Sequence, residues 1–565
     1  MSGPVKVDVL VVGSGAAGLS AAVTAAMHGA SVMVAEKASV LGGTSAWSGG
    51  WLWIPRNPLA RAEGIDEAAD APLTYLQHEM GGEAADIRLQ TFLRYGPEMV
   101  EFFHQRTAVQ FLSGSAMPDF HPSPGAANGG RSVTAQPYDG RLLGDWLHRL
   151  RPPLETISLG GMGIAGGADM AHFFNATRSP RSALYAARRL LRHGWQRLRA
   201  GRGQHLVNGN ALVARLLRSA LDAGVRFQLH APVVRLLQGP PGVSGAVLRS
   251  DGGEIHVEAG AVVLACGGFP HDRQRLAQVV PHAAEGYGHF SAAPPDNQGE
   301  GIRLGESVGG QFNTSLRHPL AWAPVSRVTL ASGQQLMFPH LVERAKPGVI
   351  AVLPNGKRFV NEADSYHDFI AALLAATPAG DTPQAWLLAD RRTLRRYGLG
   401  HARPFPFPPT AWLRTGYLQR GNTLAELAKQ CAIDANALAE TVERFNHFAS
   451  AGEDVDFHRG ASAYNRAQGD HQVTLGPLRE GPFYAVRILP GSLGTFSGLQ
   501  TDEHARVLDE QQQPIPGLYA IGNDMSSVMR GYYPSGGITL GPAMTFGYLV
   551  GKNLAKKTNI NNNIV

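Results

Sequence analysis

A glycine turn between a buried strand and an Ala-rich helix constrains the fold of this chain more than any other feature. The apolar, β-branched stretch Val7–Val12 runs directly into Gly13-Ser-Gly15-Ala-Ala-Gly18. A helical stretch from Leu19 to His28 follows, and a second strand over Ser31–Ala35 ends at Glu36. Strand, glycine turn, helix, strand and acid, in this order and spacing, make up a complete dinucleotide-binding unit. The chain is therefore predicted to be α/β, with a Rossmann-like domain at its N-terminus.

Each part of this unit has a physical role. Gly13 permits the tight turn, Gly15 lets the backbone reach a pyrophosphate, and Gly18 lets the helix pack on the strand. The helix N-terminus supplies amide donors and the positive end of the helix dipole, and Glu36 is predicted to accept hydrogen bonds from ribose hydroxyls. The binding residues predicted here are Gly13, Ser14, Gly15, Ala16, Ala17, Gly18, Glu36 and Lys37. A second match to the glycine pattern, Gly161–Gly166, has no convincing strand before it and no acid about 20 residues later, and is predicted to be a flexible loop.

Two further glycine-rich segments favour FAD over NAD. Glycine pairs bracket small hydroxyl residues in Gly42–Gly50, which makes a backbone-lined channel for the ribityl chain and the flavin edge. Near the C-terminus, the strand 517–522 ends in glycine and polar residues, and the turn 536–542 opens a helix whose N-terminus would face the flavin pyrimidine. We predict non-covalent FAD. Its further predicted contacts are Gly43, Thr44, Ser45, Ser48, Gly49, Gly50, Val234, Ala265, Gly267, Gly522, Asn523, Asp524, Gly537, Ile538 and Leu540.

Composition excludes several other classes of protein. Apolar residues make up 44% and charged residues 17%, which is typical of a soluble globular chain. The net charge of +6 is mild, and no nucleic-acid-binding motif accompanies it. No His/Cys cluster has metal-ligand spacing, so no metal is predicted. We see neither a signal peptide nor an apolar segment long enough to span a bilayer, and expect a cytoplasmic protein.

The order of the motifs predicts two domains, because 565 residues exceed what one core usually holds. Residues 1–285 and 487–565 are expected to form a discontinuous FAD-binding domain, with a helical elaboration at about 125–205. Residues 286–486 are expected to form an α+β catalytic domain that caps the flavin. An apolar substrate would bind between the two.

Residues 178–202 contain a dense run of arginines with leucines and Trp195 among them, although these apolar residues do not form one clean stripe. Two interpretations stay open. The segment is either a helix that contacts an anionic membrane surface peripherally, from which an apolar substrate could enter, or a solvated helix or oligomer contact.

Beyond these patterns, the chain resembles a known family. Gly42–Ser45 and Ser48–Gly50 are similar to the fumarate reductase and ketosteroid dehydrogenase flavoprotein superfamily. The block from Lys346 to Tyr366, together with Gly522–Gly547, resembles the 3-ketosteroid dehydrogenases, and the likeness covers about residues 5 to 555. Dicarboxylate reductases clamp their substrate with histidine and arginine, but Leu493–Gly498 has no histidine and the turn Tyr533–Gly537 has no arginine. A neutral, steroid-like ketone is therefore the expected substrate.

The resemblance implies a role for each residue of the catalytic site. The Tyr533 hydroxyl and the Gly537 N–H would bind the substrate carbonyl, and Tyr366 would take the α proton. Flavin N5 would accept hydride from the β carbon, and the electron acceptor that reoxidises the flavin is not identified by the sequence.

Two departures from the family pattern bear on which bond is oxidised. Phe120 occupies the place where enzymes that desaturate carbons 1 and 2 often carry a second tyrosine. Ser535 resembles a serine of the enzymes that desaturate carbons 4 and 5 of 5α-steroids, in which it helps take the C4 proton. We therefore favour 4,5-desaturation, with 1,2-desaturation as the alternative. The reverse reaction, reduction of an enone or an unsaturated acid, stays open, as does an electron-carrying subunit docked to a membrane partner.

Overall fold

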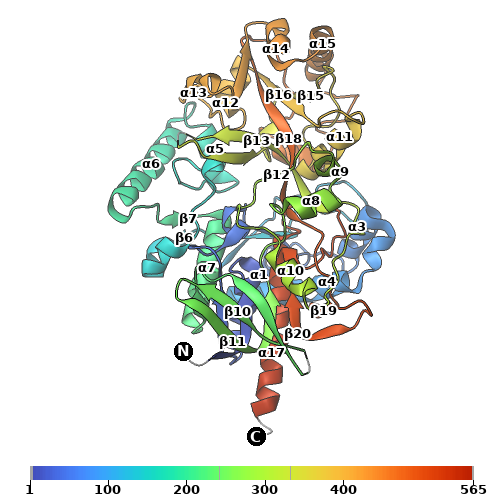
Figure 1. The fold of residues 1–565 in the computed structure, drawn as a ribbon. Helices are drawn as coiled ribbons and strands as arrows, with labels where there is room; N and C mark the ends of the chain where they lie inside the picture. The colour runs from blue at the N-terminus through green and yellow to red at the C-terminus, as the bar shows by residue number, and fades with distance from the viewer. Residues whose placement is uncertain (1–3, 241, 331, 563–565) are drawn as a thin grey trace.

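The computed structural model describes residues 4–240, 242–330 and 332–562 as two lobes, each built around a β-sheet. The lower lobe in Figure 1 contains both chain termini, and the upper lobe contains the middle of the chain. Helices and strands alternate through both, so the predicted mixed α/β class is confirmed.

The sheet of the lower lobe has the order β19-β20-β11-β1-β2-β8, with β10 and β9 added through β11. β1 pairs in parallel with β2 and β11, while β10 pairs antiparallel with β11. The strands of this sheet are β1 (Val5–Val12), β2 (Val32–Ala35), β8 (Arg226–Gln228), β9 (Val233–Gly239), β10 (Gly242–Ser250), β11 (Gly253–Leu264), β19 (Arg506–Leu508) and β20 (Pro514–Ala520).

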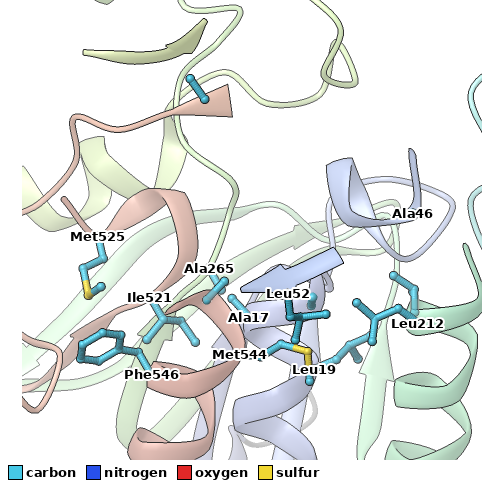
Figure 2. Close-up of a cluster of buried hydrophobic side chains, with 14 of the residues drawn as sticks. Ala17, Leu19, Ala46, Leu52, Leu212, Ala265, Ile521, Met525, Met544 and Phe546 are labelled. Carbon is cyan, nitrogen blue, oxygen red and sulfur yellow. The ribbon is translucent and has the colours of Figure 1, made fainter. Parts of the chain in front are cut away.

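Helices α1 (Ala16–Met27) and α17 (Leu540–Asn562) pack closely in this lobe because small residues lie at their contact. A Cβ at Gly547 would come within 2.6 Å of the Ala17 carbonyl oxygen, and one at Gly551 within 2.7 Å of the Ala21 oxygen. Figure 2 shows Ala17 in one apolar cluster with Met544 of α17. The parallel strands and this helix pair hold the N-terminus of α1 in a fixed place.

The sheet of the upper lobe is centred on β18, which pairs with β13 on one side and β16 on the other. Its strands are β12 (Phe290–Ser291), β13 (Leu320–Thr329), β14 (Gln335–Pro339), β15 (Val349–Val352), β16 (Ala385–Asp390), β17 (Leu418–Gly421) and β18 (Phe483–Thr495). The domain boundary that we expected at about residue 487 falls inside β18, so this strand carries the chain from the upper lobe back to the lower one.

The region 125–205 contains α6 (Pro180–Ala200), which lies along the side of the molecule in Figure 1. Two small sheets complete the β structure: β3 (Trp51–Trp53), β4 (Phe111–Ser113) and β5 (Ser132–Ala135), and the pair β6 (Tyr138–Asp139) and β7 (His205–Leu206).

The other α-helices are α2 (Pro58–Ala62), α3 (Ala71–Met80), α4 (Ile87–Arg106), α5 (Ala168–Phe174), α7 (Asn208–Asp222), α8 (Arg273–Val279), α9 (Pro281–Ala284), α10 (Glu300–Glu306), α11 (Tyr366–Ala376), α12 (Arg391–Tyr397), α13 (Thr410–Arg414), α14 (Leu424–Cys431), α15 (Ala435–Ala451) and α16 (Ala463–Gln468). Among the described residues, no helix combines the length and apolar character needed to cross a bilayer.

Candidate active site

A cavity of about 1160 Å³ extends from the N-terminus of α1 into the upper lobe and is lined by residues of both lobes. The predicted catalytic residues Tyr366, Tyr533 and Gly537 line it. So do these predicted cofactor residues: Gly13, Ser14, Gly15, Ala16, Ala17, Glu36, Lys37, Gly43, Thr44, Ser45, Ser48, Gly49, Gly50, Ala265, Gly267, Gly522, Asn523, Gly537 and Leu540.

The N-terminus of α1 forms one end of this cavity. Gly13 adopts φ +107°, and a Cβ there would lie 2.3 Å from the Ala265 carbonyl oxygen. A Cβ at Gly15 would meet only the Ser45 hydroxyl, at 3.5 Å, so the cavity side of this turn is open. The helix has neither a side-chain cap nor an acid in its first turn. The Ala16 N–H donates to the Ser45 hydroxyl at 3.0 Å, and the other N–H groups of the first turn, together with the helix dipole, fit a phosphate group.

Glu36 closes the other side of this turn. Its carboxylate accepts hydrogen bonds from the Ser14 hydroxyl at 2.6 Å and the Ala38 N–H at 2.9 Å. A carboxylate held at the end of β2 is placed to receive ribose hydroxyls. The open glycine turn, the uncapped helix and this acid together fit the adenosine diphosphate half of FAD.

The two predicted catalytic tyrosines are in direct contact. The Tyr366 hydroxyl donates a hydrogen bond to the Tyr533 hydroxyl at 2.7 Å. Phe120 stacks on the Tyr533 ring and meets Tyr366 edge-on. Burial raises the pKa of Tyr533 to about 12, and burial together with the neighbouring Tyr533 raises the pKa of Tyr366 well above its ordinary value. Both phenols are therefore protonated at neutral pH in the ligand-free site.

Gly537 offers a backbone donor beside this pair. It adopts φ +101°, and a Cβ there would lie 2.6 Å from the Trp53 backbone nitrogen. Its carbonyl accepts hydrogen bonds from the N–H groups of Trp53 and Gly541. Its own N–H has no acceptor within the described part of the chain, so it is free to bind a ligand oxygen.

Four predicted cofactor residues lie outside the lining of the cavity: Gly18, Val234, Asp524 and Ile538. Gly18 has the packing role predicted for it, because a Cβ there would lie 2.1 Å from the Gly13 oxygen. In β9 it is Val233, not Val234, that lines the cavity. The buried Asp524 carboxylate accepts the N–H groups of Cys266 and Gly268, so it supports the turn after β11 from behind.

Ser535, the residue that favoured 4,5-desaturation, is also absent from the lining of the cavity. Its hydroxyl is buried without a hydrogen bond of normal geometry, on the side where the Asp119 carboxylate lies. Asp119 in turn binds the Arg131 guanidinium and the Trp53 indole. In the ligand-free structure the Ser535 side chain therefore faces this internal network.

Several lining residues were missed from the sequence. The Asn297 amide donates to the Thr44 hydroxyl at 2.9 Å and to the Gly267 oxygen at 3.1 Å, which joins two glycine segments. Lys346 and Arg403 line the part of the cavity in the upper lobe. Lys346 was noted only as part of a family motif, and no local pattern marks Asn297 or Arg403.

His121 links the two lobes next to the tyrosines. Its ring nitrogens lie 2.5 Å from a Glu79 oxygen in α3 and 2.8 Å from an Asp368 oxygen in α11. Burial alone would lower the pKa of His121, but the hydrogen bonds to Asp368 and Glu79 outweigh it and raise the pKa to about 10. A protonated His121 thus connects the loop that carries Phe120 to the helix that begins with Tyr366.

Replacing His121 with Gln is expected to destabilise the protein by about 2 kcal/mol at pH 6, because two charge-assisted hydrogen bonds are lost. The pKa of His121 is raised on folding, so this stabilisation is complete below the ordinary histidine pKa of 6.5 and disappears as the pH rises to about 10. Thermal unfolding of both proteins at pH 6, 8 and 10 measures it, with the exposed His256→Gln as control. A difference in unfolding temperature that stays constant with pH would contradict a charged His121.

Comparisons with known proteins show what this chain is similar to. A family model described as an FAD binding domain matches residues 8–540. The chain is 40% identical to the 4-oxocyclohex-2-ene-1-carboxylate 5-dehydrogenase of Sinomonas cyclohexanicum, over 97% of this chain and 94% of that protein. It is 36% identical to the 3-oxosteroid 1-dehydrogenase of Mycolicibacterium smegmatis, over 97% of each chain. The crystal structure of the 3-ketosteroid delta1-dehydrogenase of Sterolibacterium denitrificans superposes with a TM-score of 0.88 at 36% identity, covering 98% of this chain and 100% of that one.

Proposed function

The chain belongs to the FAD-binding-domain family that includes the 3-ketosteroid dehydrogenases, and on this premise we propose that it inserts a C=C bond beside the ketone of a ring substrate, such as a steroid. It is an FAD-dependent oxidoreductase acting on CH–CH groups. The observation that carries the proposal is the hydrogen-bonded pair Tyr366–Tyr533 beside the free Gly537 N–H, all lining one cavity with the dinucleotide cradle.

The proposed reaction uses this chain's residues in two ways. The ketone oxygen accepts hydrogen bonds from the Tyr533 hydroxyl and the Gly537 N–H, which polarises the carbonyl and stabilises the enolate. Tyr366, in its phenolate form, takes the proton from the α carbon and becomes the neutral phenol, and the electrons of the broken C–H bond move toward the carbonyl. When bound, FAD supplies the oxidant that accepts hydride from the β carbon. Loss of this proton and this hydride leaves the new double bond.

For a steroid substrate, we place the new bond between carbons 1 and 2. The placement of Ser535 outside the cavity lining removes the residue on which the 4,5 preference mainly depended. Phe120 contributes no proton relay, but it packs against both tyrosines and so shapes the same pocket. Three relatives, at 40%, 38% and 36% identity, are named for dehydrogenation of a ring that carries an oxo group, which supports the reaction class.

Anaerobic mixing of the FAD-loaded protein with ring ketones tests the proposal. We expect androst-4-ene-3,17-dione to bleach the flavin absorbance and to yield the 1,4-diene on product analysis. Bleaching by 5α-androstane-3,17-dione with a 4-ene product would instead establish 4,5-desaturation. If neither steroid ketone nor 4-oxocyclohexane-1-carboxylate bleaches the flavin, the proposed function is wrong.

We also propose that α6 rests on an anionic membrane surface. Leu184, Leu191 and Leu198 are 64%, 75% and 88% exposed. With Trp195 they recur at seven- and four-residue spacing, so these four share a face of the helix, contrary to our expectation that the segment has no clear apolar stripe. The helix contains arginines but no acidic residue. Its inner side lines the cavity through Ala183, so an apolar substrate leaving a bilayer would enter directly.

The triple change of Leu184, Leu191 and Leu198 to Gln is expected to reduce binding to vesicles that contain phosphatidylglycerol by at least about tenfold, since three exposed apolar side chains are lost. Co-flotation with anionic and with neutral vesicles measures it. Ile87→Gln, which changes an exposed apolar residue elsewhere, is the control. Membrane contact would be contradicted if the wild type and both variants floated equally with the vesicles, or if the wild type did not float with them.

A further inference from the structure

Some of the charged residues that line the cavity have a partner of opposite charge, and others do not. Lys37 and Arg151 each form an ion pair, with Glu300 and Asp296. The lining acids of the upper lobe are matched too, Glu343 with His340 and Asp470 with Arg396. Glu36, the remaining lining acid, is held by Ser14 and reserved for ribose. Two lining cations, Arg403 and Lys346, form no ion pair with any carboxylate in the described part of the chain.

Both of these cations bind only backbone oxygens. One Arg403 nitrogen, Nη2, donates to the oxygens of Thr156 and Ser158 at 3.1 and 2.6 Å, which leaves Nη1 and Nε without a partner among the described residues. The Lys346 ammonium donates to the Gln468 and Gly469 oxygens, both at 2.7 Å. Burial lowers the pKa of Arg403, and burial lowers the pKa of Lys346 to about 8. At Lys346 burial outweighs the attraction of Asp470 and Glu343, and at Arg403 no carboxylate opposes the burial, so a bound anion would stabilise both cations.

The surroundings of Arg403 point to a substrate rather than to the cofactor phosphates. Arg403 lies between α12 and α13 in the chain, and its guanidinium binds the carbonyls of Thr156 and Ser158, whereas the phosphate cradle is at the N-terminus of α1 in the lower lobe. Phe405 and Phe407, which follow it in the chain, are 47% and 46% exposed and also line the cavity. Arg403 therefore stands in an apolar wall near an opening, where one end of a substrate would lie.

We propose that Arg403, with Lys346 on the same cavity, binds a carboxylate that the ring-ketone substrate carries at the end remote from its ketone. The guanidinium has free N–H donors in the fork geometry that matches a carboxylate. This inference rests on the proposed function. The Sinomonas relative is named for a substrate that has both an oxo group and a carboxylate on one ring, which agrees with such a site. The carboxylate belongs either to a small ring or to the side chain of a steroid.

The test compares substrates that differ only in charge. We would measure kcat/KM with an artificial electron acceptor for 4-oxocyclohexane-1-carboxylate and its carboxamide, and for a 3-oxo steroid with a C17 side-chain acid and its methyl ester. In the wild type, kcat/KM for the acid is expected to exceed that for its neutral partner by about tenfold or more in one of the two pairs. The pair that shows this difference identifies whether the carboxylate belongs to a small ring or to a steroid side chain. If both neutral compounds are used as well as their acids, the carboxylate site is wrong and the proposed function stands; if no ring ketone reduces the flavin, the proposed function itself fails.

Variants then assign the effect to Arg403. Arg403→Gln is expected to lower kcat/KM for the preferred acid at least about tenfold while changing that for the neutral partner less than about threefold. Arg403→Lys keeps the charge but not the forked pair of N–H donors, so its kcat/KM for the acid should lie between those of the wild type and Arg403→Gln. Equal losses on acid and neutral substrate would show a structural role and overturn the proposal. If Arg403→Gln does not fold, competitive inhibition by cyclohexanecarboxylate in the wild type and in Arg403→Lys gives the answer, and no inhibition in the wild type overturns it.

Discussion

Replacing Tyr366 with Phe is expected to slow flavin reduction by a ring ketone about 10²- to 10⁴-fold, the contribution of a positioned general base. The protein should remain yellow, because the Tyr366 hydroxyl contacts Tyr533 and not the glycine segments that form the dinucleotide cradle. Burial raises the pKa of Tyr366, so few molecules hold the phenolate at neutral pH and those that do are stronger bases. The wild-type rate should therefore increase with pH, and the rate of the variant should not. Stopped-flow measurement of flavin bleaching from pH 7 to 10 checks both expectations.

Two further variants separate chemistry from packing. Tyr533→Phe should also nearly abolish bleaching with FAD retained, because the ketone loses a hydrogen-bond donor in the enolate-like state. Tyr548→Phe removes another largely buried tyrosine hydroxyl, one that binds Glu98 away from the cavity, and should leave the rate unchanged. If Tyr366→Phe bleaches as fast as the wild type, another group takes the proton. If Tyr533→Phe instead loses its FAD, Tyr533 has a structural role that we have misassigned.

What the sequence predicts well is local. The turn Gly13–Gly18, the helix after it and Glu36 are contiguous, so spacing alone brings them together, and the structure places them around one cavity. Tyr366 is far in sequence from Tyr533 and Gly537, and only the family resemblance brought the three together. The same resemblance placed Ser535 with them. The resemblance could not show which way the Ser535 side chain points. The turn Tyr533–Gly537 lies between the cavity and Asp119, and neighbouring side chains of this turn can face either the cavity or Asp119.

What the sequence does not predict depends on long-range contacts. His121 meets Glu79 and Asp368, which are 42 and 247 residues away, so no window of sequence shows that it carries a charge. Arg403 combines two features that no stretch of sequence shows: it lines the cavity, and its hydrogen-bond partners are the carbonyls of Thr156 and Ser158. The second glycine motif, Gly161–Gly166, is a loop as expected. Its Gly163 oxygen accepts a hydrogen bond from Arg189, so this loop anchors α6.

Replacing Gly13 with Ala is expected to yield protein that does not retain FAD. At φ +107° an Ala is strained, and its Cβ would lie 2.3 Å from the Ala265 oxygen and 2.7 Å from the Ala265 carbonyl carbon. The end of β1 must then move away from the end of β11, although the Val12 oxygen accepts the Ala265 N–H there at 2.8 Å. Both ends line the cradle, so its shape is lost where backbone must approach the pyrophosphate. The ratio of flavin to protein absorbance after purification measures FAD retention.

Gly29→Ala separates the clash from backbone strain alone. Gly29 has a similar φ of +97°, but a Cβ there would have no atom within 4 Å, and the residue lies beyond the far end of α1. This variant should lose some stability and still hold FAD. Added FAD should raise the unfolding temperature of Gly29→Ala and of the wild type, because the cofactor binds only the folded chain, and should have little effect on Gly13→Ala. A yellow Gly13→Ala protein with a normal response to FAD would mean that the cofactor does not depend on close approach at this turn, and the dinucleotide cradle would have to be placed elsewhere in the cavity.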